Sequence, residues 1–315
     1  NNYSKLSQKN KIYSKLILAK IDEKNKKYLS EITNLNEAHK IYLFSKQKVV
    51  NQQFIFYKNH LPKFIGKLNK LNISLDSDLT PIFIMGLPRS GTTLVEKIIN
   101  SGNTTVQSLG EADVFDKVFY SNQIIKYKES EYKFPDFKLL QKNFINQYFA
   151  QGLKKNNLIF TDKSIANFLY LEFISKIFPK AKFIYCYRNP TANLIGVLRS
   201  FLPNIYWSHS VDKIFQIFDL YYKKLDAIKK NKMIDLHIIS LEELTLKPEI
   251  ISKDLFKFLN FVWSKDCIDS QDAKIYFKTA SNLDVRKKIR VHNLDYTSNY
   301  LKIIKDLGYD YDWLI

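Results

Sequence analysis

The chain has 315 residues, and its 49 Lys and Arg against 31 Asp and Glu give a formal net charge of +18. Hydrophobic residues make up 45% of the sequence, which supports a full core and excludes an acidic, disordered chain. The surplus of positive charge suggests an anionic partner, and charge alone leaves nucleic acid, a membrane surface and a phosphorylated or sulfated small molecule open. The alternative is that the Lys-rich composition serves no partner at all.

The first quarter of the chain is expected to be helical. Apolar and aromatic residues recur at spacings of three and four from Tyr13 to Tyr57. The polar stretch between residues 72 and 80 then breaks this pattern. We therefore predict two parts, a helical N-terminal region over residues 1–75 and an α/β domain over residues 76–315.

Short apolar runs that alternate with helical segments follow the N-terminal region. The runs lie at residues 81–85 (PIFIM), 158–160, 183–187 (FIYCY) and 236–240 (LHIIS), and residues 92–100 return to helical spacing. Runs of this length suit strands that are buried on both faces. The sequence therefore predicts an α/β fold, with a P-loop NTPase-like parallel sheet flanked by helices.

The clearest motif comes directly after the first predicted strand. Residues 86–93, GLPRSGTT, have two glycines separated by four residues and followed by two hydroxyl side chains. This frame is typical of a loop whose backbone N–H groups surround a phosphate at the start of a helix. The lysine of nucleoside triphosphatases is absent, because Thr92 stands in its place, and the nearest cation is Arg89, which can bind a tetrahedral anion through several donors.

The predicted strand at residues 183–187 ends in a second basic motif, Arg188-Asn-Pro190. Parallel α/β sheets bind ligands at the carboxyl ends of their strands, where Arg188 is expected. Pro190 suits the first turn of the helix that follows.

These motifs together resemble those of one enzyme family. PRSGTTL (88–94) is similar to the 5′-phosphosulfate loop of the sulfotransferases that use 3′-phosphoadenosine 5′-phosphosulfate (PAPS), and FIYCYRNPTANLIGVLRS (183–200) resembles their 3′-phosphate site. TASNLDVRKKI (279–289) resembles the loop that closes over the nucleotide. The resemblance covers residues 80–310 and is nearest to the tyrosylprotein-like and tetratricopeptide-linked bacterial branch, which implies that the N-terminal helices are the remnant of a repeat array.

The resemblance implies which residues hold PAPS and its product, adenosine 3′,5′-bisphosphate, without a metal. The family serine that follows the arginine by eight residues is Gly196 here, so Ser200 becomes the candidate for that contact. The implied cofactor-binding residues are Arg89, Ser90, Gly91, Thr92, Thr93, Arg188, Ser200, Ser281, Arg286 and Lys287.

The resemblance also implies three catalytic residues. Glu111, in SLGEAD, stands in a Gly-Glu context like that of the catalytic glutamate of the tyrosylprotein branch, and we expect it to act as the general base. Lys163, in TDK after the second predicted strand, matches a family lysine near the transferred group. Arg89 would hold oxygens of the sulfuryl group and of the 5′-phosphate.

The predicted function is transfer of a sulfuryl group from PAPS to a hydroxyl acceptor, which is a protein tyrosine, a sugar or a small molecule, with an acidic peptide or a glycan among the open choices. The alternatives are a nucleotide-binding protein of the same fold that has lost catalysis, and a P-loop kinase. The lysines are scattered and no nucleic-acid motif occurs, so we expect no nucleic-acid partner. No apolar run approaches about 20 residues, the N-terminus lacks a secretory signal, and two distant cysteines form no framework, so we expect a cytoplasmic protein without a membrane span. The oligomeric state is left open.

Overall fold

The computed structural model describes residues 2–44, 46–68, 70–71, 73–121, 136–231, 234–269, 289, 291 and 293–314. Its contacts divide the chain into two compact units, each assembled from separated segments. Unit 1 comprises Asn1–Lys58, Asn189–Ala227 and Asn293–Ile315, and unit 2 comprises Asn59–Arg188 and Ile228–His292. The predicted division at residue 75 concerned separate domains, which this contact-based division does not test, so it stays a prediction.

Unit 2 is built on a five-stranded sheet in the order β2-β3-β1-β4-β5, and every pair of neighbours is parallel. The strands are β1 (Thr80–Gly86), β2 (Gln107–Ser108), β3 (Ile159–Asp162), β4 (Lys182–Tyr187) and β5 (Leu236–Ser240). Four of them lie where the apolar runs predicted strands. The chain therefore has the α/β fold with a P-loop NTPase-like parallel sheet that the sequence predicts.

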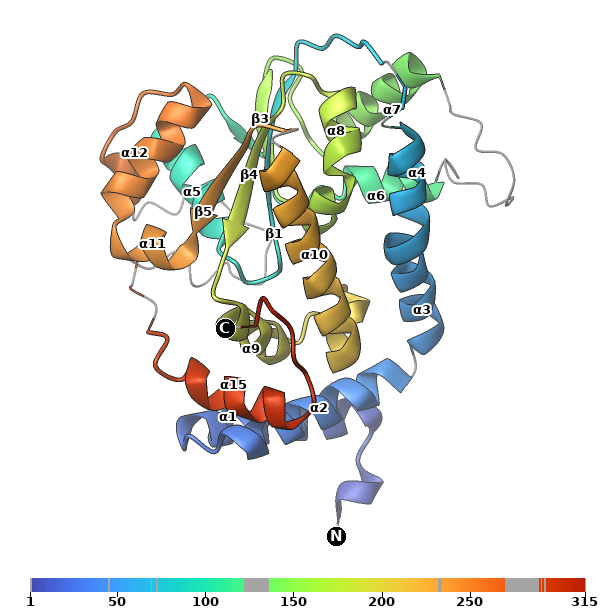
Figure 1. Ribbon diagram of the computed structural model, residues 1–315, viewed down its shortest axis with the longest axis vertical. Coiled ribbons are helices and arrows are strands. Elements are labelled where there is room, and N and C mark those ends of the chain that lie inside the picture. The colour runs from blue at the N-terminus through green and yellow to red at the C-terminus, as the bar shows by residue number, and fades with distance from the viewer. Residues whose placement is uncertain are drawn as a thin grey trace. The chain divides into compact units, whose positions relative to one another are not determined.

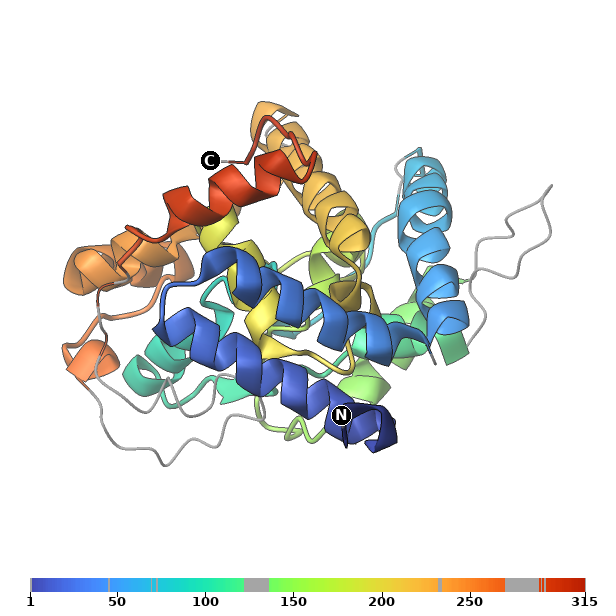
Figure 2. The ribbon, with the colours of Figure 1, turned by 90° about the horizontal axis from the view of Figure 1, so that it is seen from below.

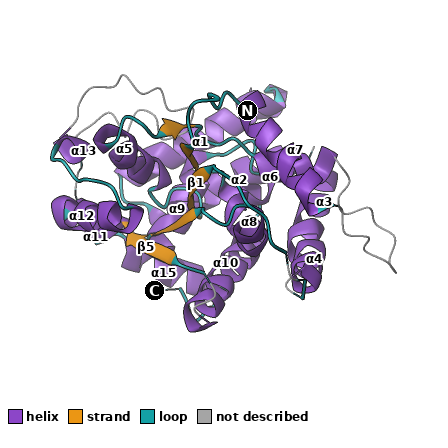
Figure 3. Ribbon diagram, turned by 90° about the horizontal axis from the view of Figure 1, so that it is seen from above, coloured by secondary structure: helices purple, strands orange, loops and turns teal. Residues whose placement is uncertain are grey.

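Helices cover both faces of this sheet, as Figures 1 and 3 show. The helix α5 lies on one face with α11 and α12, and the opposite face carries α6 and α8. The helical elements described in unit 2 are α4 (Leu61–Leu68), α5 (Thr92–Gly102), α6 (Val114–Ser121), α7 (Phe137–Ala150), the 3₁₀ turn η3 (Ile165–Tyr170), α8 (Leu171–Ile177), α11 (Leu241–Leu246), α12 (Pro248–Leu259) and α13 (Asp266–Asp269).

The alternation of side chains along β1 creates a different core on each face. Ile82 and Ile84 are buried in an aliphatic cluster with residues of α5 and α12. Phe83 points the other way, and its ring lies 5.8 Å from Phe183 and 5.9 Å from Phe115. Because successive strand residues face opposite sides, one continuous apolar run supplies both cores.

Unit 1 is helical. Figure 2 shows α1 and α2 (blue) side by side, and a three-residue turn joins them. The prediction of helices in the N-terminal region is confirmed, although Tyr13 and Ile21 of α1 are about half exposed. The remaining bounds are η1 (Asn2–Lys5), α1 (Gln8–Lys24), α2 (Tyr28–Phe44), α3 (Gln47–Ile55), the π turn η2 (Phe56–His60), α9 (Pro190–Ser200), η4 (Tyr206–His209), α10 (Val211–Asn231) and α15 (Thr297–Asp306).

A buried carboxylate ties the segments of unit 1 together. Glu31 on α2 is 1% exposed and accepts a hydrogen bond of 2.7 Å from Nε of Arg199 on α9. The hydroxyl of Tyr300 on α15 donates to the same carboxylate and accepts a bond of 2.8 Å from Arg199. The network thus links three helices that are far apart in the sequence.

Candidate functional site

The loop between β1 and α5 turns through three residues with positive φ. Gly86 has φ +152°, Arg89 +68° and Gly91 +98°. A Cβ on Gly86 would lie 2.5 Å from the carbonyl oxygen of Cys186, so only glycine fits this approach of two backbones. The conformation follows from the two glycines of the motif, as the sequence predicts for a phosphate loop.

The start of α5 offers several groups to an anion. Gly91 is the N-cap of this helix, and Thr92 and Thr93 open its first turn, where backbone N–H groups point outward. Ser90 is 1% exposed, and its Oγ is a buried hydroxyl that makes no hydrogen bond within the described protein. A buried polar atom of this kind fits a loop that is completed by a phosphate or sulfate oxygen.

Arg188 joins the second motif to this loop. It follows β4, whose Cys186 pairs in register with Gly86 of β1. Its Nη1 donates a hydrogen bond of 3.0 Å to the carbonyl oxygen of Arg89. In the strand order β2-β3-β1-β4-β5, β2 and β3 lie on one side of β1, whereas β4 and β5 lie on the other. The direction of the strand order thus reverses at β1, and open parallel sheets bind ligands at such a reversal.

Two of the three predicted catalytic residues, Lys163 and Glu111, contact each other. Nζ of Lys163 lies 2.9 Å from Oε1 of Glu111. The side chain of Lys163 is fully buried, whereas that of Glu111 is 41% exposed. Lysine is almost never fully buried without a partner, and Glu111 is the partner that offsets the charge of Lys163. A lysine with no role beyond the surface would not need to be buried in this way.

A tight turn after β3 presents Lys163. Asp162 is fully buried, and its Oδ1 accepts bonds from the backbone N–H of Ser164 at 2.9 Å and from its hydroxyl at 2.5 Å. Oδ2 of Asp162 accepts a bond of 2.8 Å from the hydroxyl of Tyr148, and burial together with this carboxylate raises the pKa of Tyr148. The turn is therefore fixed on both sides of Lys163.

Acidic groups surround Asp113, which follows Glu111 by two residues. Desolvation of the Asp113 carboxyl group, followed by the negative charges of Asp162, Asp116 and Glu111, raises the pKa of Asp113 to about 7, although the residue as a whole is exposed. Lys117 acts in the opposite direction. At neutral pH, Asp113 is thus divided between its protonated and charged forms.

The sequence analysis missed Glu96, which lies on α5 one turn after the phosphate loop. It is fully buried, and its Oε1 accepts bonds of 2.8 Å from both Ser108 and Thr161. Burial raises its pKa, while the charge of Lys163 is the largest of the opposing influences. The signal in the sequence is a charged residue three positions before Ile99, on the apolar face of a predicted helix.

The remaining predicted contacts belong to other parts of the chain. Ser200 belongs to unit 1, and its hydroxyl donates to the carbonyl oxygen of Gly196 at 2.7 Å. Its neighbour Arg199 is bound to Glu31, as described above. Ser281, Arg286 and Lys287 lie outside the described residues, so their roles stay predictions.

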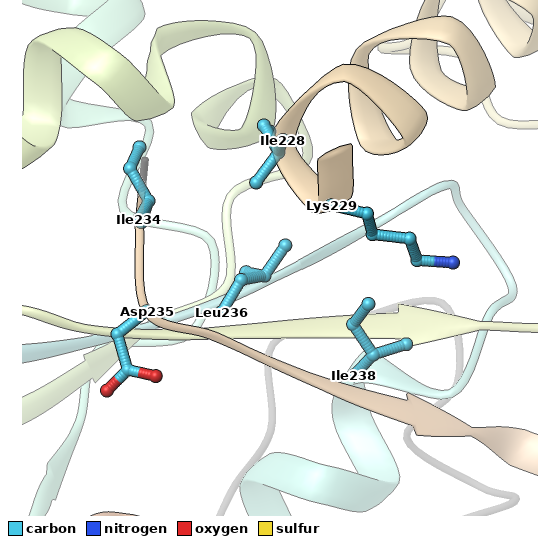
Figure 4. A pocket seen from close by; sticks show the side chains of 6 residues that line it. All are labelled: Ile228, Lys229, Ile234, Asp235, Leu236 and Ile238. Carbon is cyan, nitrogen blue, oxygen red and sulfur yellow. The ribbon is translucent and has the colours of Figure 1, made fainter. Parts of the chain in front are cut away.

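A cavity of about 400 Å³ lies elsewhere in unit 2, beside β5 (Figure 4). Its lining residues are Ile228, Lys229, Ile234, Asp235, Leu236 and Ile238. Leu236 opens β5 and pairs with Phe183 near the beginning of β4, whereas Arg188 follows the end of β4. The cavity is therefore separate from the candidate site.

The described residues hold no group of three or more His, Cys, Asp or Glu side chains that could bind a metal ion. No helix in the described ranges is long and apolar enough to cross a membrane.

Comparisons with known proteins agree with the motifs. The model of the Sulfotransferase family matches residues 81–265, which is more than half of the chain. An uncharacterized protein of Aquifex aeolicus (strain VF5) is 25% identical over 247 residues, which are 71% of this chain but only 31% of that relative. Among solved structures, the sulfotransferase domain from the curacin biosynthetic pathway is similar with 17% identity and a TM-score of 0.41, over 74% of this chain and 98% of that one. The sulfotransferase STF1 from Mycobacterium tuberculosis H37Rv is similar with 9% identity and a TM-score of 0.42, over 86% and 85%.

Proposed function

Because the chain belongs to the sulfotransferase family, we propose that it transfers a sulfuryl group from PAPS to a hydroxyl acceptor. The observation that carries this proposal is the arrangement of the polar groups. The phosphate loop, Lys163 and Arg188 follow the carboxyl ends of β1, β3 and β4, which are adjacent in the sheet.

The phosphate loop and Arg188 would bind the donor. The backbone from Ser90 to Thr93, with their hydroxyls, would hold oxygens of the 5′-phosphosulfate, and the helix start favours negative charge there. Arg188, whose Nη1 is bonded to the loop, would bind the 3′-phosphate through its guanidinium. Arg89 would add a second cation from within the loop. Ser200, Ser281, Arg286 and Lys287 stay proposed contacts of the same donor.

Bound PAPS supplies an activated sulfuryl group, and the protein must accept one proton and balance one developing charge. Glu111 is the proposed base: its exposed carboxylate takes the proton of the acceptor hydroxyl, whose oxygen then bonds to sulfur. Lys163 is the proposed cation that offsets the charge left on the departing phosphate oxygen. Both groups are held by the turn after β3 and by their mutual ion pair.

The acceptor is proposed only as a hydroxyl compound, with protein tyrosine, sugar and small molecule retained as classes. We also propose a cytoplasmic location. Cys186 and Cys267 are buried free thiols, which a reducing compartment preserves.

The test is the transfer of labelled sulfate from PAPS to a panel of phenol, sugar and tyrosine-peptide acceptors. We expect transfer by the wild type and a loss of at least about 100-fold in Glu111→Gln, because removing a general base costs roughly that factor or more. Arg89→Ala should abolish adenosine 3′,5′-bisphosphate binding in calorimetry. Unchanged binding by Arg89→Ala would contradict the assignment of the donor site.

The same assay distinguishes a second candidate function. Binding of adenosine 3′,5′-bisphosphate without turnover on any acceptor would favour a nucleotide-binding protein that has lost catalysis. The hydroxyl of Ser200, bonded to Gly196 rather than presented freely, is the observation that keeps this alternative.

A further inference from the structure

Glu96 is an unusual residue for the place it occupies. Its helical neighbours Val95, Ile98 and Ile99 are fully or almost fully buried apolar residues, and Glu96 is buried among the same core elements. A buried carboxylate loses several kcal/mol of hydration, which apolar side chains at the same position would not. Its Oε2 is also buried without a well-formed hydrogen bond, and the backbone N–H of Gly110 favours the ionised form of this carboxylate. The fold alone does not require a charge here.

The contacts of Glu96 lead to both proposed catalytic residues. Ser108, which donates to Oε1, precedes Glu111 by three residues, and Thr161, which donates to the same oxygen, precedes Lys163 by two. The two segments are further joined by backbone bonds, from Leu109 N–H to Thr161 O at 3.1 Å and from Lys163 N–H to Gly110 O at 2.9 Å. One carboxylate oxygen thus holds together the ends of β2 and β3.

The anchored segments carry the two members of one ion pair. Lys163 is fully buried, and its Nζ lies 2.9 Å from Oε1 of Glu111. The positive charge of Lys163 also favours the ionised form of Glu96, although burial raises the pKa of Glu96 overall. Glu96 therefore acts on the pair through the geometry of the segments that carry it.

We propose that Glu96 is a positioning residue of the catalytic site: by accepting hydrogen bonds from Ser108 and Thr161, it fixes the segments that carry Glu111 and Lys163. This inference rests on the proposed sulfuryl transfer for its kinetic part only.

The kinetic test compares Glu96→Leu with Glu96→Gln and Asn100→Ala. Leu removes both acceptor contacts, whereas Gln keeps the volume and an oxygen that accepts from Ser108 and Thr161. Asn100 is buried one turn further on α5 and donates to the Glu96 carbonyl oxygen at 2.8 Å, so Asn100→Ala perturbs the same helix without changing charge.

For Glu96→Leu we expect kcat to fall about 10- to 100-fold, the range seen when supporting residues of a site are removed. The KM for PAPS and the affinity for adenosine 3′,5′-bisphosphate should change less than about twofold, because the bonds of Glu96 hold the segments of Glu111 and Lys163 rather than the phosphate loop. Glu96→Gln, which restores an acceptor oxygen, should recover most of kcat, and Asn100→Ala should retain it. A Glu96→Leu variant with wild-type kcat would overturn the kinetic part.

The anchoring part has a test that needs no activity. In Glu96→Leu, which removes both acceptor contacts, the amide hydrogens of Leu109 and Lys163 should exchange with solvent at least about tenfold faster than in wild type, since local opening governs exchange. In Glu96→Gln they should exchange as in wild type. Equal exchange in wild type and Glu96→Leu would overturn the anchoring role. If the wild-type chain transfers no sulfuryl group, the proposed function fails while this measurement still decides the role of Glu96.

Discussion

The guanidinium of Arg188 donates a hydrogen bond to the backbone of Arg89, 99 positions earlier in the chain. The contact is made to a residue in the left-handed conformation, so the turn at Arg89 directs its carbonyl oxygen toward the neighbouring strand end. The two basic motifs of the sequence therefore form one structure, in which Arg188 supports the loop as well as any ligand.

Replacing Arg188 should show whether ligand binding depends on this side chain or only on the net positive charge of the protein. We expect Arg188→Ala to weaken adenosine 3′,5′-bisphosphate binding about 10- to 100-fold, because hydrogen bonds to charged groups contribute about 1.5–3 kcal/mol. The matched control is Lys182→Ala, at the opposite end of β4, where Nζ lies over the ring of Phe258. Calorimetry should show unchanged affinity for the control. Equal losses in both variants would mean that net charge, not this site, determines binding.

The same substitution, glycine to alanine, should change the stability of the protein in opposite directions at Gly86 and Gly66 of unit 2. Gly86→Ala should destabilise the protein by more than about 2 kcal/mol, because its Cβ would meet backbone at 2.5 Å. Gly66→Ala should stabilise it by about 0.5–1 kcal/mol, since Gly66 is an exposed position of α4 with open space around its Cα. Urea denaturation measures both, and a stable Gly86→Ala variant would contradict the loop conformation.

Asp113 should make stability depend on pH in a defined direction. Its pKa rises from 3.8 to about 7 on folding, so the folded state binds the proton more tightly. The contribution of Asp113 to the stability of the wild type should therefore decrease as pH rises from about 4 to 7. Asp113→Asn cannot lose a proton and tolerates the left-handed conformation, so its advantage should grow across this window and stay constant above it, at about 1 kcal/mol after solvent screening. Denaturation curves at several pH values give the difference, and one that is independent of pH would refute the prediction.

The Glu31–Arg199 pair should matter more when broken than when replaced. Arg199→Met leaves the buried Glu31 carboxylate with Tyr300 as its remaining partner in this network, and we expect a loss of about 3 kcal/mol. Replacing both residues by apolar ones, in the double variant Glu31→Leu with Arg199→Met, should recover most of that loss of stability. Thermal or urea unfolding of the four proteins in the cycle measures the coupling, and additive losses would show that the pair is not a unit.

Much of the sheet was predictable because buried parallel strands leave a local signature. The apolar runs at residues 81–85, 183–187 and 236–240 coincide with β1, β4 and β5 to within one residue at each end. β2 was missed because Gln107 and Ser108 are polar and pair with β3 alone. A two-residue edge strand buries too little to require an apolar pattern.

The site was predictable where function follows from backbone geometry, and less so where it follows from packing. The glycine spacing at residues 86–93 identified the loop, since positive φ at Gly86 and Gly91 is a local requirement. Glu96 was not identified, because its partners Ser108 and Thr161 are 12 and 65 residues away and only the fold brings them together. The pairing of Lys163 with Glu111 across 52 residues depends on the fold in the same way.

The network around Glu31 also constrains how the chain matures during synthesis. Its members come from the second helix, the middle of the chain and the last described helix, with 269 positions between Glu31 and Tyr300. Glu31 is synthesised before Arg199 and Tyr300, so its carboxylate lacks both partners while the intervening residues are made. α1 and α2 can form their hairpin early from local contacts, but the network closes only after α15 has been synthesised. Folding of unit 1 is thus completed by a segment that is made long after its first helices.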